Sequence, residues 1–201
     1  MKTQTLFFSA LTLSAMLILS GCAGDPQEAP AQSPAASASH SGHSMSQSVS
    51  ANDADMAFAS GMKMHHEQAI EMSDILLEKE SIPEDIAALA TRIKVAQSPE
   101  IERMDRWLAD WGMSDLMDHP SMEHGDGMVP KDEIKALKEA SGKEAAKLFL
   151  EQMITHHEGA VDMAETEINE GSYPAAIDLS KDIVKSQNEE IQEMKQLLAA
   201  L

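Results

Sequence analysis

Two segments of the chain each carry a tandem histidine pair flanked by methionines. They are FASGMKMHHEQAIEM at 58–72 and FLEQMITHHEGAVDM at 149–163, and the second follows the first at an offset of 91 residues. Imidazole nitrogens and thioether sulfurs are both ligands for transition metals. The shared pattern M-x-x-HH-x-x-A-x-x-M therefore supplies eight candidate metal ligands. They are Met62, His65, His66, Met72, Met153, His156, His157 and Met163.

Helical geometry separates the two histidines of each pair. Consecutive residues of an α-helix point about 100° apart, so the two rings cannot face the same neighbour. His65 falls in the middle of an apolar stripe and is expected to face the interior, whereas His66 falls on the flank of the helix. His156 and His157 repeat this arrangement. Each half of the chain is therefore expected to offer one Met–His–Met face to the interior.

Two ways of satisfying the interior histidines remain open. A buried imidazole without a partner is costly, and one metal ion shared by His65 and His156 would satisfy both rings. Hydrogen bonds to Gln97 and Gln187, which interrupt the apolar stripes, would do so without metal. Methionine at helical spacing is also ordinary core filling. The residues alone therefore leave both a metal site and a packed core open.

A second group of candidate ligands lies between the two segments. Residues 113–128, MSDLMDHPSMEHGDGM, contain Met113, Met117, His119, Met122, His124 and Met128. Packing does not explain methionines in a loop rich in Gly, Pro and Asp. Thioethers select Cu(I), and imidazole binds either oxidation state of copper. The segment predicts copper binding, with Cu(I) favoured and Cu(II) as the second choice. The alternative is a flexible, oxidisable loop without metal.

The periodicity of the chain predicts four long helices arranged as two repeated hairpins. Apolar residues recur at spacings of three and four along 58–76 and 86–108, and the pattern returns in the second half. Each hairpin is apolar on one face, and two such faces bury each other best in a bundle. The expected fold is an all-α four-helix bundle over 51–201. The first hairpin takes 51–111, the connector takes 112–142 with a short helix at 131–140, and the second hairpin takes 143–201.

Local signals predict where the helices begin and end. Capping boxes at 50–53 and 141–144 would begin the first and third long helices. Gly171 would end the third, and Pro174 would stand near the start of the fourth. Pro99 falls inside the second helix and would kink or restart it, because proline lacks a backbone N–H donor.

The N-terminus has the pattern of an export signal. Lys2 precedes an uncharged apolar stretch at 6–20, which is shorter than the roughly 20 residues of a membrane span. The stretch ends in LSGC, which resembles a bacterial lipobox. Residues 1–21 are therefore predicted to be a lipoprotein signal peptide, with Cys22 lipidated and 22–50 a flexible tether. The alternative is a plain signal peptide cleaved nearby.

This N-terminus also predicts a location. Lipidated at its first mature residue, the protein would stand on the periplasmic face of the outer membrane. In a Gram-positive host it would stand on the outer face of the cell membrane. The lipid anchor would be its only contact with the membrane.

The composition and the missing motifs argue against several functions. The 34 acidic and 15 basic residues give a net charge of −19, which is unsuited to displacing counterions from nucleic acid. A single Cys permits neither an intrachain disulfide nor a Cys-based zinc site. The expected bundle helices have no E-x-x-H motif, which argues against di-iron oxidation. No catalytic constellation is evident, so a binding protein is expected rather than an enzyme. A redox enzyme using bound copper is the weakest alternative.

These features resemble one bacterial family. Paired M-x-x-HH-x-x-A-x-x-M helices after an export signal are similar to exported proteins of unknown function classed as ferritin-like. Some members of that family are periplasmic copper-binding proteins linked to copper tolerance. The resemblance covers about 53–201 and implies the bundle fold and copper binding by the paired histidine segments.

The sequence therefore predicts an exported, membrane-tethered copper-binding protein. It would buffer copper, contribute to tolerance, or hand the metal to an envelope copper-handling protein. The alternative is an interaction module without metal. In that case the acidic surface would contact an envelope protein, and the histidine pairs would be structural.

Overall fold

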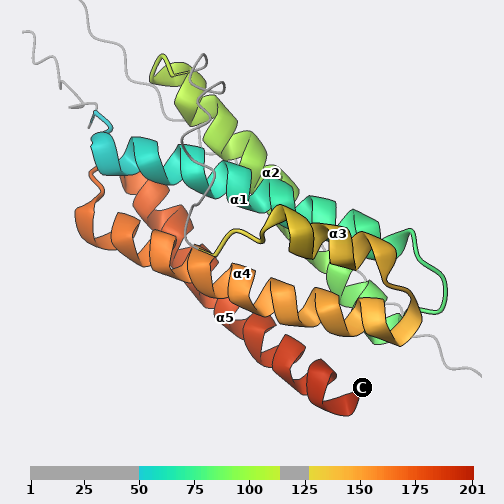
Figure 1. The fold of residues 1–201 in the computed structure, drawn as a ribbon. Helices are drawn as coiled ribbons and strands as arrows, with labels where there is room; N and C mark the ends of the chain where they lie inside the picture. Colours follow the sequence, from blue (N-terminus) through green and yellow to red (C-terminus); the bar gives the residue numbers. More distant parts are fainter. Residues whose placement is uncertain (1–49, 114–126) are drawn as a thin grey trace, which may run out of the picture. The chain divides into compact units, whose positions relative to one another are not determined.

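The computed structural model describes residues 50–113 and 127–201, which contain helices and no strand. Figure 1 shows α1 (Asp53–Leu77), α2 (Glu84–Asp110), α3 (Lys131–Glu139), α4 (Gly142–Glu170) and α5 (Pro174–Ala200). The expected all-α fold is confirmed, and the expected short helix of the connector is present as α3. The signal peptide, most of the tether and five candidate site residues lie outside the described residues: Cys22, Met117, His119, Met122 and His124.

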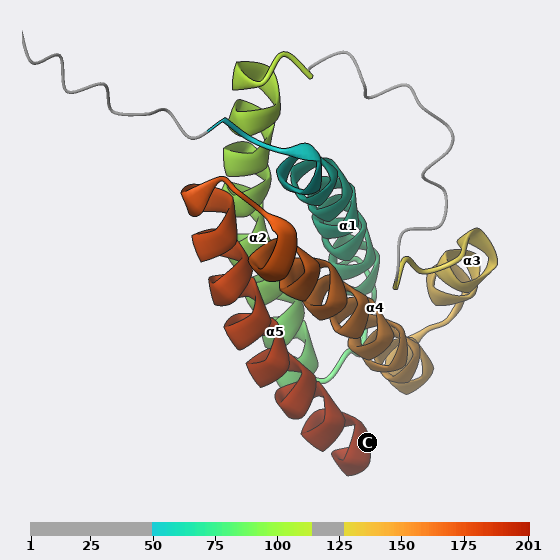
Figure 2. The ribbon, with the colours of Figure 1, turned by 90° about the vertical axis from the view of Figure 1, so that its left-hand side faces the viewer.

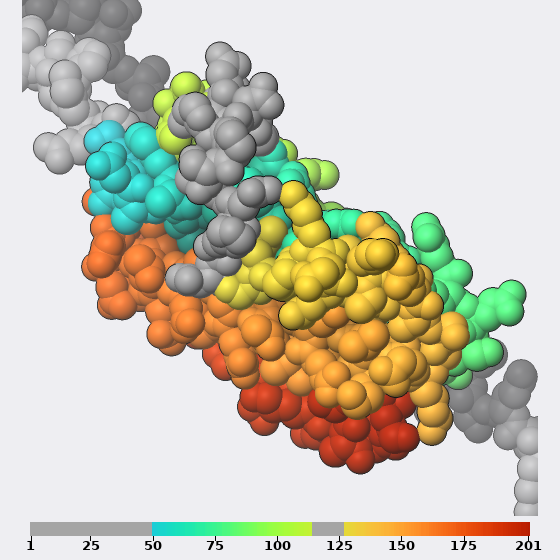
Figure 3. Space-filling view, in the orientation of Figure 1, coloured from blue at the N-terminus to red at the C-terminus, as the bar shows by residue number. Residues whose placement is uncertain are grey.

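The four long helices form a bundle of two hairpins. α1 packs against α2, α4 packs against α5, and α1 lies along α4 (Figures 1 and 2). The residues that follow α4 contact the start of α1, so these two helices run antiparallel. α3 lies outside the bundle over α1 and α4, and Figure 3 shows its yellow side chains filling the junction between them. None of the described helices has the length and apolar character needed to cross a membrane.

The ends of α1, α4 and α5 show where local signals succeed and where they fail. Gly171 caps α4 and Pro174 is the first residue of α5, as predicted. The capping box predicted at 50–53 is wrong, because Asn52 is the N-cap of α1. Its side chain accepts a hydrogen bond from the backbone N–H of Asp55, and the Asp55 carboxylate accepts one from the N–H of Asn52. The capping box therefore forms two residues later than expected.

The predicted capping box of α4 forms only in part, and Pro99 does not interrupt α2. Ser141 is the N-cap of α4, as the predicted box requires, but its side chain makes no capping hydrogen bond. α2 continues through Pro99 without ending or restarting there. The missing N–H of this proline therefore does not divide the helix.

The buried core consists of two apolar clusters at opposite ends of the bundle. The first cluster surrounds Leu76 and Phe149, and the second surrounds Phe58 and Trp107. Along every long helix, the chain passes from one cluster to the other through a buried polar stretch. We call these side chains the polar layer: His65, His66, Gln97, His156, His157 and Gln187.

The connector rejoins the bundle beside the polar layer. The side chain of Gln68 on α1 donates to the Val129 carbonyl oxygen at 3.0 Å and accepts from the Val129 N–H at 2.8 Å. Gly127 has a φ of +83° and lies so close to α4 that a Cβ there would stand 2.7 Å from the Cα of Gly159. Residues 127–130, called the strap below, are therefore held against both α1 and α4.

Candidate metal centre

The histidines of the two repeated pairs are all buried at the centre of the bundle. His65 and His156 are each 1% exposed, and His66 and His157 are each 0% exposed. His66 and His157, which were expected on the flank of their helices, are therefore buried as well. Each of these two rings faces the second helix of its own hairpin.

His65 and His156 contact each other across the α1–α4 interface. Their ring centroids are 3.6 Å apart and the ring planes are inclined by 36°. Neither ring nitrogen of His156 has a hydrogen-bond partner. Burial, followed by the neighbouring histidines, holds the pKa of His156 well below its usual range. The ring is therefore neutral at physiological pH, which is the form that binds a metal ion.

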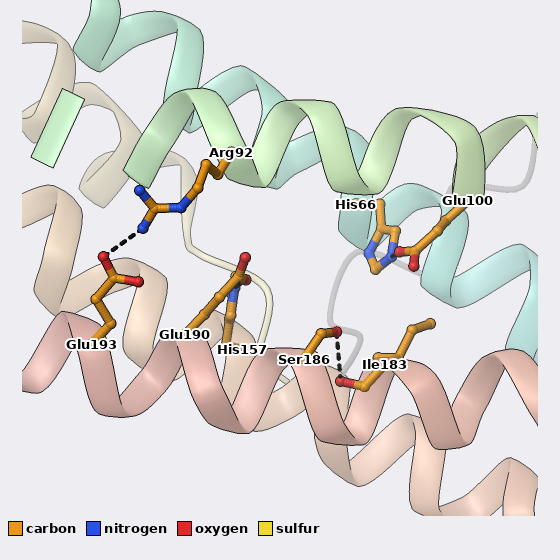
Figure 4. A network of polar contacts seen from close by, with 8 residues as sticks. All are labelled: His66, Arg92, Glu100, His157, Ile183, Ser186, Glu190 and Glu193. Atoms are coloured by element: carbon orange, nitrogen blue, oxygen red, sulfur yellow. Dashed lines mark hydrogen bonds and ion pairs between the residues drawn. The ribbon is translucent and has the colours of Figure 1, made fainter. Parts of the chain in front are cut away.

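Two glutamates that the sequence analysis did not include close the outer side of the polar layer. His66 Nε2 lies 2.8 Å from Glu100 Oε2 on α2, and His157 Nε2 lies 2.7 Å from Glu190 Oε2 on α5. Figure 4 shows the two pairs on the two hairpins. The other ring nitrogen, Nδ1, is buried without a hydrogen-bond partner in both histidines. The signal for these glutamates was present, since they match each other at an offset of 90 residues.

The polar layer lacks the histidine–glutamine hydrogen bonds that the metal-free alternative predicts. That alternative satisfies the interior histidines through hydrogen bonds to Gln97 and Gln187. Both glutamine side chains are 3% exposed, and neither Oε1 accepts a hydrogen bond. The glutamine carbonyl oxygens therefore do not serve as acceptors for the imidazole N–H groups.

Methionines gather on both sides of the polar layer. Because α1 and α4 are antiparallel, the first methionine of each motif meets the last methionine of the other. Met72 and Met153 belong to the first apolar cluster together with Met194 from α5. The second cluster contains Met62 and, from α2, Met104, with Met163 packed against them. Met104 and Met194 were absent from the expected site, although they too match at an offset of 90 residues.

Two candidate ligands of the connector fall within the described residues, and their surroundings differ. Met113 packs against the second apolar cluster. Met128, in the strap, lines a surface hollow of about 360 Å³ between α3 and α4. The structure thus places these two methionines in separate environments.

The ligand types at the centre narrow its chemistry. Within residues 50–113 and 127–201, no three side chains of the His, Cys, Asp and Glu types converge in a way that could hold a metal ion. The methionines on both sides of the polar layer are the other candidate ligands in this region. Soft monovalent ions such as Cu(I) accept that ligand set.

The fold and the site define a helical bundle with a buried histidine layer between two methionine-containing apolar clusters. The chain belongs to the family described as a domain of unknown function, DUF305, whose model matches residues 55–198. No curated protein matches the chain. The ferritin-like classification stays a prediction.

Solved structures of the same fold include proteins crystallised with metals. A DUF305 fragment from Deinococcus radiodurans is 28% identical, with a TM-score of 0.68, and the match covers 75% of this chain and 99% of that one. A DUF305 protein from Streptomyces coelicolor, described as secreted, is 33% identical, with a TM-score of 0.68 and coverages of 73% and 93%. CopM in its Cu(I)-bound form is 32% identical, with a TM-score of 0.60 and coverages of 73% and 96%.

Proposed function

We propose that this chain binds copper in the bundle core, for buffering, tolerance or transfer to an envelope partner. The observation that carries the proposal is the contact between His65 and His156. Two imidazole rings meet inside the protein, and no donor or acceptor satisfies the nitrogens of His156. A bound cation would satisfy such nitrogens, and neutral imidazole is a common metal ligand.

The methionines favour Cu(I) as the form bound in the core. Methionine side chains belong to the apolar clusters on both sides of the histidine contact, so thioether sulfur is present in the same core. Thioether and imidazole together suit Cu(I), whereas imidazole with carboxylate suits Cu(II). The carboxylates of Glu100 and Glu190 at the edge of the polar layer therefore leave Cu(II) as the second ion.

The relatives support the metal rather than the metal-free function. CopM has been crystallised in Cu(I)-bound, Cu(II)-bound and Ag-bound forms, and these are 30–33% identical to this chain. Silver(I) shares the preference of Cu(I) for soft ligands. The secreted protein from Streptomyces coelicolor supports export of this chain. Lipid anchoring through Cys22 belongs to the same proposal and rests on the lipobox alone.

Copper-dependent melting of the full chain tests the core site. Metal that binds only the folded state stabilises it by about 2.7 kcal/mol when its free concentration is a hundred times Kd. For a domain of this size that corresponds to a rise in Tm of roughly 5–10 °C. The variant His65→Leu with His156→Leu should lose most of this rise. Without metal it should melt no lower than wild type, because two buried polar rings are removed.

A matched control separates ligand loss from a general change in the polar layer. Gln97→Leu with Gln187→Leu also replaces two buried polar side chains, but removes no metal ligand. This control should keep the copper-dependent rise in Tm. If the histidine variant keeps the full rise, the core histidines do not bind the metal. If wild type shows no rise and binds no Cu(I) in an anaerobic titration, the proposed function is wrong.

A further inference from the structure

The two histidine–glutamate pairs of the polar layer are built alike from separate halves of the chain. His66 on α1 meets Glu100 on α2, and His157 on α4 meets Glu190 on α5, at 2.8 and 2.7 Å. Both histidines are 0% exposed, and the glutamate side chains are 21% and 20% exposed. The same contact, burial and direction therefore recur in both hairpins, although nothing in helix packing alone requires a carboxylate there.

A carboxylate beside a ring nitrogen favours the tautomer that carries hydrogen on that nitrogen. An ionised carboxylate has no hydrogen to donate and only accepts. The nitrogen facing it, Nε2, must therefore be the N–H donor in both pairs. In a neutral ring the lone pair then belongs to Nδ1, which in both histidines is buried and has no hydrogen-bond partner.

This arrangement matches the surroundings of a metal-binding histidine. Such histidines almost always donate their second ring N–H to a carboxylate, a carbonyl or water, which fixes the ring and the tautomer. The contact between His65 and His156 is of another kind, because those two rings contact each other across the α1–α4 interface. The two kinds of histidine in each tandem pair thus have different surroundings.

We infer that Glu100 and Glu190 are positioning residues that hold His66 and His157 in the Nε2–H tautomer, with Nδ1 as the copper-binding nitrogen. The inference rests on the proposed copper-binding function for its second half only. The tautomer is a property of the metal-free chain and can be measured separately.

Nitrogen-15 NMR of the imidazole rings tests both halves in the full-length chain. In the metal-free protein at neutral pH, long-range proton–nitrogen spectra should show hydrogen on Nε2 and a lone pair on Nδ1 for His66 and His157. Anaerobic addition of Cu(I), which is diamagnetic, should then shift the Nδ1 resonances of both rings. The Nε2 resonances should stay close to their metal-free positions.

The variant Glu100→Gln with Glu190→Gln removes the selection but keeps the size of both side chains. A glutamine amide both donates and accepts, so neither tautomer is imposed. The Nε2–H tautomer should no longer be exclusive, and Cu(I) affinity should fall by about tenfold to a hundredfold, as for other groups that orient metal ligands. Glu193→Gln is the matched control. This carboxylate lies one turn further along α5 and pairs with Arg92 instead of a histidine (Figure 4).

Each outcome decides one part of the inference. A lone pair on Nε2, or rings protonated on both nitrogens, would overturn the tautomer assignment. Nδ1 resonances that stay unchanged while the chain binds Cu(I) would overturn the ligand assignment and leave the proposed function intact. A chain that binds no Cu(I) at all would instead remove the proposed function, and the ligand assignment with it. Unchanged tautomer and affinity in the double variant would show that the glutamates do not position the rings.

Discussion

Stability should depend on pH through a buried carboxyl pair at the junction of the two hairpins. Asp55 on α1 is 0% exposed, and Glu167 on α4 is 1% exposed. Burial alone would raise the pKa of Asp55, but hydrogen bonds outweigh it and lower that pKa, chiefly those from the N–H groups of Asn52 and Tyr173. Burial and the contact with Asp55 raise the pKa of Glu167 to about 8. At neutral pH one proton therefore stays on Glu167, beside the Asp55 carboxylate.

The sign of the pH dependence follows because Glu167 binds its proton more tightly in the folded chain than in the unfolded chain. The folded chain binds this proton up to about pH 8, whereas the usual pKa of a glutamate is 4.5. The stabilisation is therefore fully present below pH 4.5 and is lost as the pH rises through about 8. A pKa difference of one corresponds to about 1.4 kcal/mol, so the free energy of unfolding should fall by about 2 kcal/mol between pH 6.5 and 8. Over the whole interval the loss reaches about 5 kcal/mol at most.

Urea unfolding of the metal-free chain measures this loss. His156 acts in the opposite direction at lower pH, because its lowered pKa costs stability as the pH falls below 6.5. The comparison therefore uses pH 6.5–8 and the variant Glu167→Gln, which keeps a neutral donor beside Asp55. The variant should be nearly independent of pH over this range and more stable than wild type at pH 8. Glu170→Gln, which changes an exposed carboxylate one turn away, should keep the wild-type slope. Equal slopes for wild type and Glu167→Gln would refute the reasoning.

Three further changes test other parts of the molecule. Cys22→Ser should release the protein from membranes in a fractionation assay, and continued membrane association would rule out the lipid anchor. Replacing the connector methionines Met113, Met117, Met122 and Met128 together should weaken Cu(I) binding in a competition titration, and an unchanged affinity would exclude the loop. Some loss of Tm is expected as well, because Met113 packs against the second apolar cluster. Gln68→Leu should lower the free energy of unfolding by about 1–3 kcal/mol, because it leaves the backbone groups of Val129 without their partners. Amide hydrogen exchange at Val129 should speed up as well, and unchanged exchange would show that the strap is held by other contacts.

The bundle could be predicted from the sequence because its determinants are local and repeated. Apolar spacing identifies the helices, and Gly171 and Pro174 mark a break that the structure contains. The start of α1 could not be found in the same way. Asn52 outcompetes the upstream serine because its side chain also donates to the Glu170 carbonyl oxygen and to Ser172 Oγ, both at 2.8 Å. Those partners are distant in the sequence, so a local capping pattern contains no trace of them.

The interior position of His65 and His156 could be predicted from the sequence, whereas the burial of His66 and His157 could not. A helical wheel gives the angle between His65 and His66 correctly, since one meets the opposite hairpin and the other its own. The wheel contains no information on what covers a flank. Glu100 and Glu190 close over the flanking rings, although a charged residue on a helix is usually solvated. A polar residue that repeats exactly where a buried histidine needs an acceptor is the signal that would have identified them.

One position at which the two halves of the repeat differ has a structural explanation. At the offset of 91 residues that relates the motifs, Gln68 corresponds to Gly159, although the neighbouring residues are identical. Packing between two equivalent hairpins would not by itself require different residues at these two positions. The strap supplies the reason, because it crosses both helices at this level and meets a different need on each side. On α1 the glutamine bonds both backbone groups of Val129, and on α4 the backbone of Gly159 lies so close to the strap that a Cβ at Gly127 would stand 2.7 Å from its Cα. The difference between Gln68 and Gly159 therefore marks the place where the strap, which is not repeated, packs against the two repeated helices. This place lies within one helical turn of the contact between His65 and His156.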